Sequence, residues 1–317
     1  MKILVTGCAG FIGSHLCEKL LEKSFIVVGV DNFDDYYSKE TKEQNLSYFI
    51  NHPNFTFVEL DLTNKKELFT LNKFDVVVHL AAKAGVRPSI ETPLDYIKHN
   101  IEASQNLLDF MVSRNIKKYI FASSSSIYGN TSQIPFTEND PCNHVISPYA
   151  YTKKAGEMMN YTYHHLNEID VVNLRFFTVF GPRQRPDLAI HKFVNLIRNE
   201  QPIEMYGDGS SARDYTYIDD VIFGIVSSIN YVLNNVNVYE QINIGNNYPV
   251  SLKKLIEAIS ASLKINPIVN QIAQQRGEVD ITFADISKAK ELLNYFPQTK
   301  FEDGIFQFVN WFKKKHG

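Results

Sequence analysis

The sequence predicts an α/β protein whose main part is a doubly wound parallel sheet, followed by a smaller α/β region on the C-terminal side. Three observations support this prediction. Short, almost continuously apolar runs alternate with helical patterns through the first 180 residues, as is typical of parallel strands buried on both faces. A glycine-rich turn joins the first apolar run to the first helical pattern. Beyond residue 180 the alternation is less regular and turn signals are denser, which indicates a change of architecture.

The first part of the chain contains six apolar runs that we expect to form strands, with helical patterns between them. The strands are expected at Lys2–Thr6, Phe25–Val30, Phe55–Leu60, Val76–Leu80, Tyr119–Ala122 and Val171–Arg175. The helices are expected at Ile12–Leu21, Pro93–Val112 and Tyr149–Leu166. Crossovers between parallel strands are right-handed, so a ligand crevice is expected at the carboxyl ends of the strands.

The second part of the chain begins after Gly181 and Pro182. Helical patterns recur there at Lys192–Arg198, Leu252–Leu263, Ile286–Leu293 and Phe301–Lys313. We therefore divide the chain into residues 1–180 and 181–317. Some segments of the second part are expected to return to the main sheet.

Composition points to a globular protein without a nucleic-acid-binding surface. Of its 317 residues 44% are hydrophobic and 21% are charged, and the net charge is -3 at pH 7, so there is no basic excess for nucleic acid. Cys8, Cys17 and Cys142 have no paired spacing, which favours a reducing, cytoplasmic location. The apolar runs are far shorter than the ~20 residues that span a bilayer, and the N-terminal residues read directly into a strand. We expect neither a signal peptide nor a membrane partner.

The glycine-rich turn predicts a dinucleotide site. Gly7, Gly10 and Gly13 lie between the first strand and the first helix, where glycine permits a tight turn and a close approach of the backbone to a pyrophosphate. The N-terminus of the helix offers N–H groups to the phosphates. The second strand runs into Asp31, from where a carboxylate binds ribose hydroxyls and repels a 2′-phosphate. The sequence therefore predicts a Rossmann fold that binds NAD rather than NADP.

A second set of residues predicts acid–base chemistry. The fifth strand runs into serines that include Ser124, and Tyr149 and Lys153 are four residues apart, hence on one face of a helix that Pro148 can begin. An ordinary phenol, with a pKa of about 10, is a poor base at neutral pH. A neighbouring ammonium and the positive nicotinamide are expected to favour the phenolate. We predict that Tyr149 removes a hydroxyl proton and that Ser124 holds the hydroxyl in line.

The order of glycine loop, serine-ended strand and Tyr-x-x-x-Lys resembles the extended short-chain dehydrogenase/reductase family over essentially the whole chain. Several segments are similar to the UDP-glucuronate 4-epimerases of that family, namely Asp31–Tyr37, His79–Ser89, Arg175–Pro182, Arg185–Asp187, Tyr206–Gly209 and Arg213–Asp220. The resemblance implies a UDP-sugar substrate, recycled NAD and a transient 4-keto sugar. Thr178 stands where glucose/galactose epimerases usually carry asparagine.

The resemblance also implies which residues contact the two ligands. For the cofactor they are Gly7, Gly10, Phe11, Ile12, Gly13, Asp31, Asn32, Asp61, Leu62, Leu80, Ala81, Ala82, Asn100, Tyr149 and Lys153. For the UDP-sugar they are Arg87, Ser125, Ser126, Thr178, Arg185, Arg213, Gln275, Arg276 and Glu278. Asp61 is expected to meet the adenine, Arg213 a phosphate and Glu278 the uridine ribose. Whether Gln275 or Arg276 contacts the nucleotide stays open.

A uronate substrate sets a chemical requirement. Oxidation at C4 of UDP-glucuronate gives a β-keto acid, which loses CO2 readily, so an epimerase must hold the carboxylate in an orientation that disfavours the loss. Ser125, Ser126 and Thr178 offer hydroxyls for this purpose. Arg185 and Arg87 are expected nearby as charged donors.

Other activities and partners are predicted as follows. The 4,6-dehydratases of the family carry a Thr-Asp-Glu run where this chain has only serines, which argues against dehydration. Three alternatives remain: epimerisation of UDP-glucose or UDP-N-acetylglucosamine, decarboxylation of UDP-glucuronate, and a non-catalytic nucleotide-sugar sensor.

No histidine spacing predicts a metal site. Relatives are commonly homodimers packed through two helices, which here correspond to Pro93–Val112 and Tyr149–Leu166.

Overall fold

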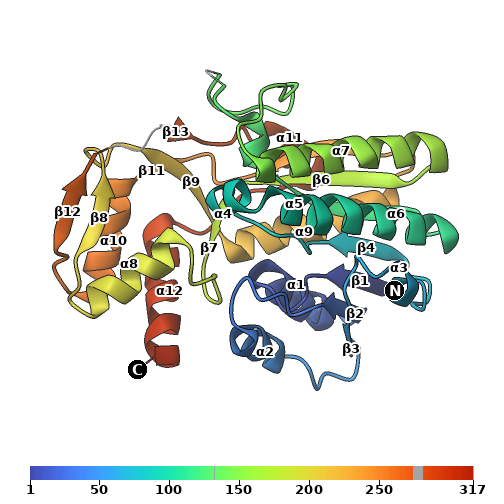
Figure 1. The fold of residues 1–317 in the computed structure, drawn as a ribbon, viewed down its shortest axis with the longest axis horizontal. Coiled ribbons are helices and arrows are strands. Elements are labelled where there is room, and N and C mark those ends of the chain that lie inside the picture. The colour runs from blue at the N-terminus through green and yellow to red at the C-terminus, as the bar shows by residue number, and fades with distance from the viewer. Residues whose placement is uncertain (132, 274–280, 317) are drawn as a thin grey trace.

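A computed structural model of the chain describes residues 1–131, 133–273 and 281–316. Figure 1 shows a larger lobe that contains the N-terminus and a smaller lobe that contains the last helix. Among the described residues, no helix combines the length and apolar character that crossing a bilayer requires.

A seven-stranded sheet forms the centre of the larger lobe, in the order β10-β6-β5-β4-β1-β2-β3. Every neighbouring pair of strands is parallel. The strands are β1 (Lys2–Thr6), β2 (Ile26–Asp31), β3 (Phe55–Glu59), β4 (Val76–His79), β5 (Lys118–Ser124), β6 (Asp170–Phe176) and β10 (Tyr239–Ile244). The strand order reverses between β1 and β4, where a doubly wound sheet opens its crevice. The fold class expected from the sequence is confirmed.

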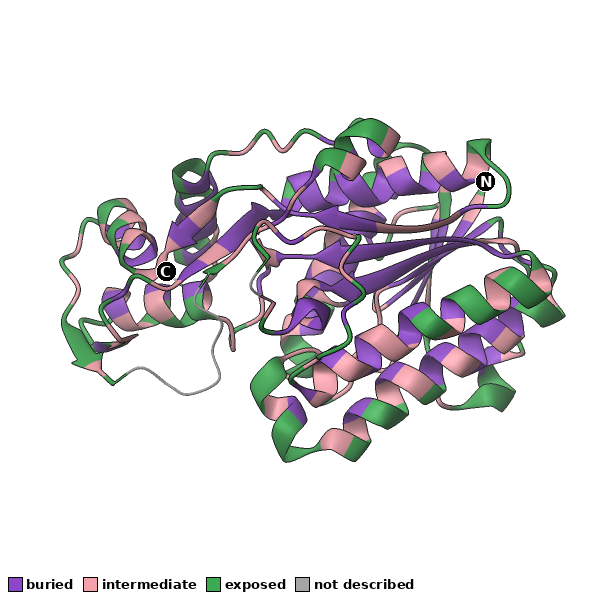
Figure 2. Ribbon diagram, turned by 90° about the horizontal axis from the view of Figure 1, so that it is seen from above, coloured by how far each residue is buried: buried purple, intermediate pink, exposed green. Residues whose placement is uncertain are grey.

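Helices cover both faces of this sheet, which Figure 2 shows as a buried layer between them. One face carries α1 (Phe11–Glu22) and α9 (Ile218–Asn234), with α2 (Lys39–Ser47) beside α1 and α11 (Ser287–Leu293) beside α9. The other face carries α3 (Lys65–Leu68), α6 (Ala103–Ser113) and α7 (Pro148–Asn167). Because side chains alternate along a strand, Ile3 and Val5 of β1 join the first core and Leu4 joins the second.

The helix predicted over Pro93–Val112 is irregular in its middle. It consists of α5 (Pro93–Tyr96), a π-helical segment η1 (Ile97–Glu102) and α6, and it follows the short α4 (Val86–Glu91). Single π turns inside helices often accompany functional sites. Here Asn100 lies in the π segment, and its side chain bonds the backbone N–H and C=O of Lys83 at 2.8 and 2.9 Å.

The smaller lobe is built around β9 (Ala212–Tyr217). Its neighbours are β7 (Thr178–Phe180), β11 (Pro249–Ser251) and β13 (Ile281–Thr282). A two-stranded sheet of β8 (Ile203–Tyr206) and β12 (Val269–Ile272) lies beside α8 (Ala189–Arg198), α10 (Leu252–Leu263) and α12 (Phe301–His316). Helix α9 and strand β10 follow β9 in the chain but belong to the larger lobe.

Candidate active site

The carboxyl ends of the central strands open into a cleft of about 700 Å³ that also reaches Arg213 and Thr282 of the smaller lobe. All the sequence-predicted ligand residues that the structure describes line this cleft, except Asn100. Gln275, Arg276 and Glu278 lie outside the described residues. A smaller hollow of about 420 Å³ lies at the far ends of α6 and α7 and contains none of the predicted residues.

The glycine loop is packed too tightly for side chains. Gly7 has φ +73°, and a Cβ added there would lie 2.8 Å from the backbone nitrogen of Ala81. A Cβ on Gly13 would lie 2.0 Å from the carbonyl oxygen of Gly7. Gly10 caps α1 without a side chain to accept from the first helical N–H groups. These N–H groups therefore face the cleft as donors for an anion.

The end of the cleft where adenosine is expected to bind, here called the adenosine end, contains a buried carboxylate, Asp31. Its two oxygens accept hydrogen bonds from the backbone N–H groups of Phe33 and Ala9 at 2.9 and 3.2 Å. Burial raises the pKa of Asp31, while Lys42 and these two hydrogen bonds act in the opposite direction. The ammonium of Lys42 lies 3.9 Å from the carboxylate, so the buried carboxylate has a cationic neighbour. Each oxygen keeps acceptor capacity for a ribose hydroxyl.

Asp61 lies at the next strand end. It accepts from the N–H and hydroxyl of Thr63, both at 2.8 Å, and from the amide of Asn32 at 3.2 Å. Burial opposes ionisation, but the hydrogen bonds outweigh it and lower the pKa of Asp61. Its charge is thus stabilised before any ligand binds.

The catalytic end of the cleft is organised by the first turn of α7. Pro148 begins this helix, and the Ser147 hydroxyl accepts from the N–H of Ala150 at 3.1 Å. Tyr149 therefore lies at the positive end of the helix dipole. The hydroxyl of Ser124, at the end of β5, lies beside the Tyr149 phenol and acts to lower its pKa.

Lys153 lies one turn further along α7 and is buried. Its ammonium donates to the carbonyl oxygen of Ala122 at 2.7 Å and lies 6.0 Å from the centre of the Tyr149 ring. Burial lowers the pKa of Lys153 to about 7. The predicted helical face shared by Tyr149 and Lys153 is present.

The electrostatics differ from the expected ammonium-stabilised phenolate. Burial raises the pKa of Tyr149, and the neighbouring Ser124 hydroxyl lowers it only in part. Desolvation disfavours the charged form of both the phenol and the ammonium. In the protein alone, therefore, burial dominates the pKa values of both Tyr149 and Lys153.

Hydroxyl groups cluster beside Tyr149. The short helical turn η2 (Ser125–Tyr128) follows β5, and the hydroxyl of Ser126 donates to that of Ser124 at 2.9 Å. The half-buried Ser125 and Thr178 line the same cleft. Hydroxyls in one hydrogen-bonded chain polarise one another, so this group offers adaptable donors to an anion.

The three arginines that were predicted to bind the UDP-sugar come from three different segments. Arg185 binds Asp187 through two hydrogen bonds of 3.0 and 2.8 Å, and its guanidinium lies 5.0 Å from the centre of the Tyr36 ring. Arg87 lies over the ring of Tyr206 at 5.7 Å, so the larger lobe contacts the smaller one there. Arg213 donates to the neighbouring carbonyl of Ala212 at 2.9 Å.

These features have counterparts in known proteins. Residues 3–245 match the NAD dependent epimerase/dehydratase family. The chain belongs to this family. A UDP-glucuronate 4-epimerase of Thermodesulfobacterium geofontis (strain OPF15) is 42% identical over 315 residues, which are 98% of this chain and 96% of the relative. The predicted family membership is confirmed.

Comparison with solved structures covers the whole of the present chain. The UDP-glucuronic acid 4-epimerase from Bacillus cereus, in complex with UDP-glucuronic acid and NAD, has a TM-score of 0.91 and 37% sequence identity, with 100% of both chains covered. A UDP-glucose 4-epimerase from Thermotoga maritima, with UDP-glucose, has a TM-score of 0.88 and 30% identity, again with 100% of both chains covered.

Asn100 does not line the cleft as the other predicted residues that the structure describes do, and its contact with the cofactor stays a prediction. Instead of lining the cleft, its side chain is occupied by the backbone of Lys83 and by the hydroxyl of Thr152, to which it donates at 3.0 Å. In this family member Asn100 therefore supports the β4–α4 loop from behind.

Three cleft residues of this family member were not predicted individually. Lys42 lies beside Asp31, Tyr36 lies beside Arg185, and Lys83 forms an ion pair with Asp34 at 3.3 Å. The available signal was the polar segment after Asp31, which is rich in aspartate and tyrosine. Among the described residues, no group of three or more His, Cys, Asp or Glu side chains is arranged to hold a metal ion.

Proposed function

We propose that this protein catalyses the NAD-dependent 4-epimerisation of a UDP-sugar, interconverting UDP-glucuronate and UDP-galacturonate. The observation that carries the proposal is the position of Tyr149 beside Ser124 at the end of β5, where the Ser124 hydroxyl accepts a hydrogen bond from that of Ser126 at 2.9 Å. A base and a group of anion-binding hydroxyls would then share one wall of the cleft. The similarity to the B. cereus enzyme, which binds UDP-glucuronic acid and NAD, supports the choice of substrate.

The residues of the cleft fit NAD. The glycine loop leaves no room for a Cβ at Gly7 or Gly13 and presents the N-terminus of α1 to a pyrophosphate. Asp31 is placed for the adenosine ribose and Asp61 for the adenine side. The described acidic residues that line the cleft are Asp31, Asp34 and Asp61, and a 2′-phosphate near them would be repelled. When bound, NAD accepts a hydride from sugar C4 and returns it.

Tyr149 acts as the base that takes the C4 hydroxyl proton and later gives it back. Ser124 holds that hydroxyl and the phenol in one hydrogen-bonded line, so the proton has a short path. Lys153 contributes positive charge when protonated, which favours the phenolate. Rotation of the flat 4-keto sugar about its diphosphate linkage then exposes its other face, which inverts C4 without net oxidation.

Ser125, Ser126 and Thr178 bind the sugar carboxylate by hydrogen bonds. They hold its C–C bond away from the orientation that favours loss of CO2 from the keto intermediate. Arg185 is already oriented by Asp187, so its planar guanidinium is available at a fixed position on the cleft wall. Arg87 and Arg213 bind the UDP-sugar from the two sides of the lobe boundary.

The decisive experiment is product analysis with UDP-glucuronate and NAD. We expect UDP-galacturonate, with Tyr149→Phe abolishing turnover while UDP binding, measured by calorimetry, is retained. UDP-glucose and UDP-N-acetylglucosamine are the comparison substrates. Faster epimerisation of either would reject the uronate assignment, CO2 release would indicate a decarboxylase, and normal turnover by Tyr149→Phe would reject the catalytic scheme.

We further propose that the protein is a cytoplasmic homodimer packed through the helical stretch Pro93–Val112, which comprises α5, η1 and most of α6, and through α7. Large apolar side chains on these helices are exposed, at 78% for Leu94, 64% for Met158 and 69% for Leu166, and burying them against a second copy would stabilise a dimer. Light scattering after gel filtration should give twice the monomer mass. Met158→Glu should shift it toward the monomer, whereas a monomeric parent protein would reject this arrangement.

A further inference from the structure

The segment Asn32–Tyr37, between β2 and α2, is shaped by its own side chains. The side-chain oxygens of Asp31, Asn32 and Asp34 each accept from the N–H two residues later, at 2.9, 3.0 and 3.0 Å. Phe33 has a positive φ of 51°. Consecutive Asx turns fix the path of a loop locally. We refer to Asn32–Tyr37 as the strap.

The strap reaches across the cleft to the opposite loop. Strands β2 and β4 lie on either side of β1, so Asp34 follows one neighbour of β1 and Lys83 follows the other. The Asp34 carboxylate lies 3.3 Å from the Lys83 ammonium, and both residues line the cleft. This ion pair therefore spans the carboxyl end of β1, where the glycine loop lies.

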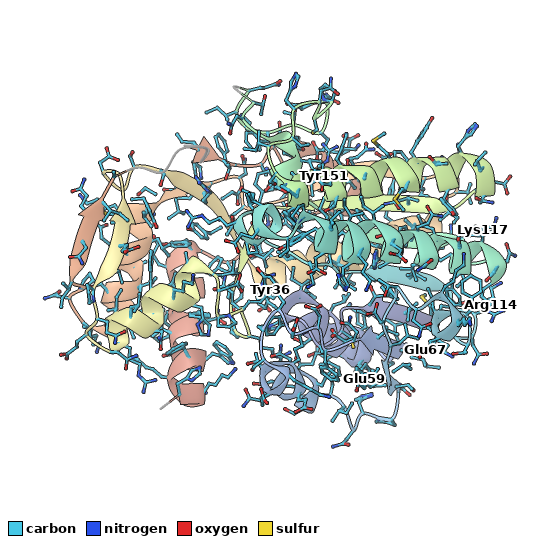
Figure 3. All side chains as sticks on the ribbon, in the orientation of Figure 1. Tyr36, Glu59, Glu67, Arg114, Lys117 and Tyr151 are labelled. Carbon is cyan, nitrogen blue, oxygen red and sulfur yellow. The ribbon has the colours of Figure 1, made fainter. Side chains whose placement is uncertain are left out.

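Two tyrosines of the strap also contact loops on both sides of the cleft. The Tyr37 hydroxyl lies 3.8 Å from where a Cβ of Gly10 would be, so the strap borders the glycine loop directly. The Tyr36 hydroxyl lies 2.9 Å from the corresponding point at Gly85, beyond β4. Figure 3 labels Tyr36 near the centre of the molecule, where the two lobes meet. A dinucleotide with its pyrophosphate on the glycine loop would thus be straddled by the strap.

Lys83 is held firmly on its own side of the cleft. Its ammonium also pairs with Asp95 of α5, and its backbone is bonded by Asn100. Burial would lower the pKa of Lys83, but the interactions with Asp95 and Asp34 outweigh it and raise the pKa. Lys83 therefore stays a cation at neutral pH. Asp95 serves as the near anchor and Asp34 as the far one.

We propose that the strap closes over bound NAD and that the Asp34–Lys83 ion pair controls how slowly the cofactor leaves. This inference rests on the proposed function. In an epimerase the same cofactor molecule must serve both half-reactions, and its loss between them would leave the keto sugar unreduced. Asp34 and Lys83 are positioning residues here, since they act by holding the strap.

The test measures NAD release directly. Protein loaded with NAD is diluted, and released cofactor is trapped by an excess of an NAD-consuming dehydrogenase. Asp34→Asn and Lys83→Gln should each speed release about tenfold, which corresponds to about 1.4 kcal/mol. The double variant should be no faster than either single one, because the same ion pair is lost. Asp34→Asn keeps an oxygen for the Tyr36 N–H, so the turn is preserved.

Asp95→Asn is the matched control. It removes an ion pair of Lys83 that does not cross the cleft, so release should change less than threefold. Equal acceleration by Asp34→Asn and Asp95→Asn, or release unchanged in both cross-cleft variants, would overturn the proposal. Because the readout needs no UDP-sugar, it distinguishes a failure of the strap proposal from a failure of the proposed function. If Asp34→Asn releases NAD faster than the parent, the strap proposal is supported even if the protein does not epimerise UDP-glucuronate. If Asp34→Asn is fully active and releases NAD at the parent rate, only the strap proposal is rejected and the proposed function stands.

Discussion

The two ends of the cleft differ in how far hydrogen bonds and counter-charges compensate their buried ionisable groups. At the adenosine end, Asp31 and Asp61 each accept at least two hydrogen bonds from fixed donors in the protein. At the catalytic end, burial pushes both Tyr149 and Lys153 toward their neutral forms. The first arrangement lowers the pKa of Asp61, and at Asp31 it opposes part of the rise that burial causes, so it suits binding. The second keeps a phenol and an amine close to proton exchange, as acid–base chemistry requires.

The difference predicts separable defects. Changes at the catalytic end should reduce kcat at saturating cofactor, and changes at the adenosine end should weaken cofactor binding while leaving kcat nearly intact. Buried charges that lack full compensation also destabilise the fold, so the conflict between activity and stability should be largest at Lys153, whose pKa burial lowers to about 7.

The largest expected effect is on kcat. Lys153→Met removes the positive charge that favours the Tyr149 phenolate, and kcat should fall about a thousandfold, within the range of general acid–base catalysis. Steady-state assays at saturating NAD and UDP-glucuronate measure it. Lys19→Met is the control, since Lys19 forms an exposed pair with Glu22. A loss below tenfold in Lys153→Met would show that Tyr149 does not need the ammonium.

The next effect concerns cofactor affinity. Asp31→Asn removes a charged acceptor for the ribose hydroxyls, and hydrogen bonds to charged groups contribute about 1.5–3 kcal/mol, so Kd for NAD should rise roughly 10- to 100-fold. Binding is measured by calorimetry, and kcat at saturating NAD should stay within about threefold of the parent. Glu59→Gln should change neither. Glu59, which Figure 3 labels at the edge of the larger lobe, forms an exposed pair with Lys39. A drop in kcat equal to the loss of affinity would erase the contrast between the two ends.

Much of this contrast was predictable from the sequence. Local patterns place the glycine loop, Asp31, and the pair Tyr149 and Lys153, because each depends on spacing within one strand–turn–helix unit. The path of the chain beyond residue 180 was harder to predict from the sequence. Helix α9 was not predicted, although its buried apolar residues, such as Ile218, Val221 and Ile225, recur at helical spacing. Strand β10 follows it back to the main sheet.

The contacts between distant segments could not be predicted. Helix α2 is largely polar, so periodicity does not reveal it, and Lys42 gains its role only when α2 packs beside the glycine loop. The approach of Arg185 to Tyr36 joins residues from different lobes. The direction of the pKa shift at Tyr149 also depends on burial, which spacing along a helix does not report.

A smaller effect concerns product ratio. Thr178→Val and Ser126→Ala each remove a hydroxyl proposed to hold the sugar carboxylate, so the share of decarboxylated product should rise about three- to tenfold, since one hydrogen bond contributes about 0.5–1.5 kcal/mol. Chromatography of the UDP-sugars measures the ratio. Thr162→Val, on the exposed side of α7, is the control. An unchanged ratio in both variants would reject the carboxylate role.

The smallest effect is on stability. It tests whether burial of the Lys153 ammonium at the catalytic end lowers the free energy of unfolding. The pKa of Lys153 is lowered to about 7 in the folded protein, against about 10.4 for an unfolded lysine. Between these values the unfolded state binds more protons, so this group makes the free energy of unfolding rise with pH. Lys153→Met removes the burial penalty, so its melting temperature relative to the parent should be highest near pH 7, by about 3 °C, and should decline toward pH 10. The lost hydrogen bond to Ala122 acts at every pH, so the decline is the test. Lys19→Met should show a constant difference, and a difference for Lys153→Met that does not change with pH would mean that the buried ammonium carries no penalty.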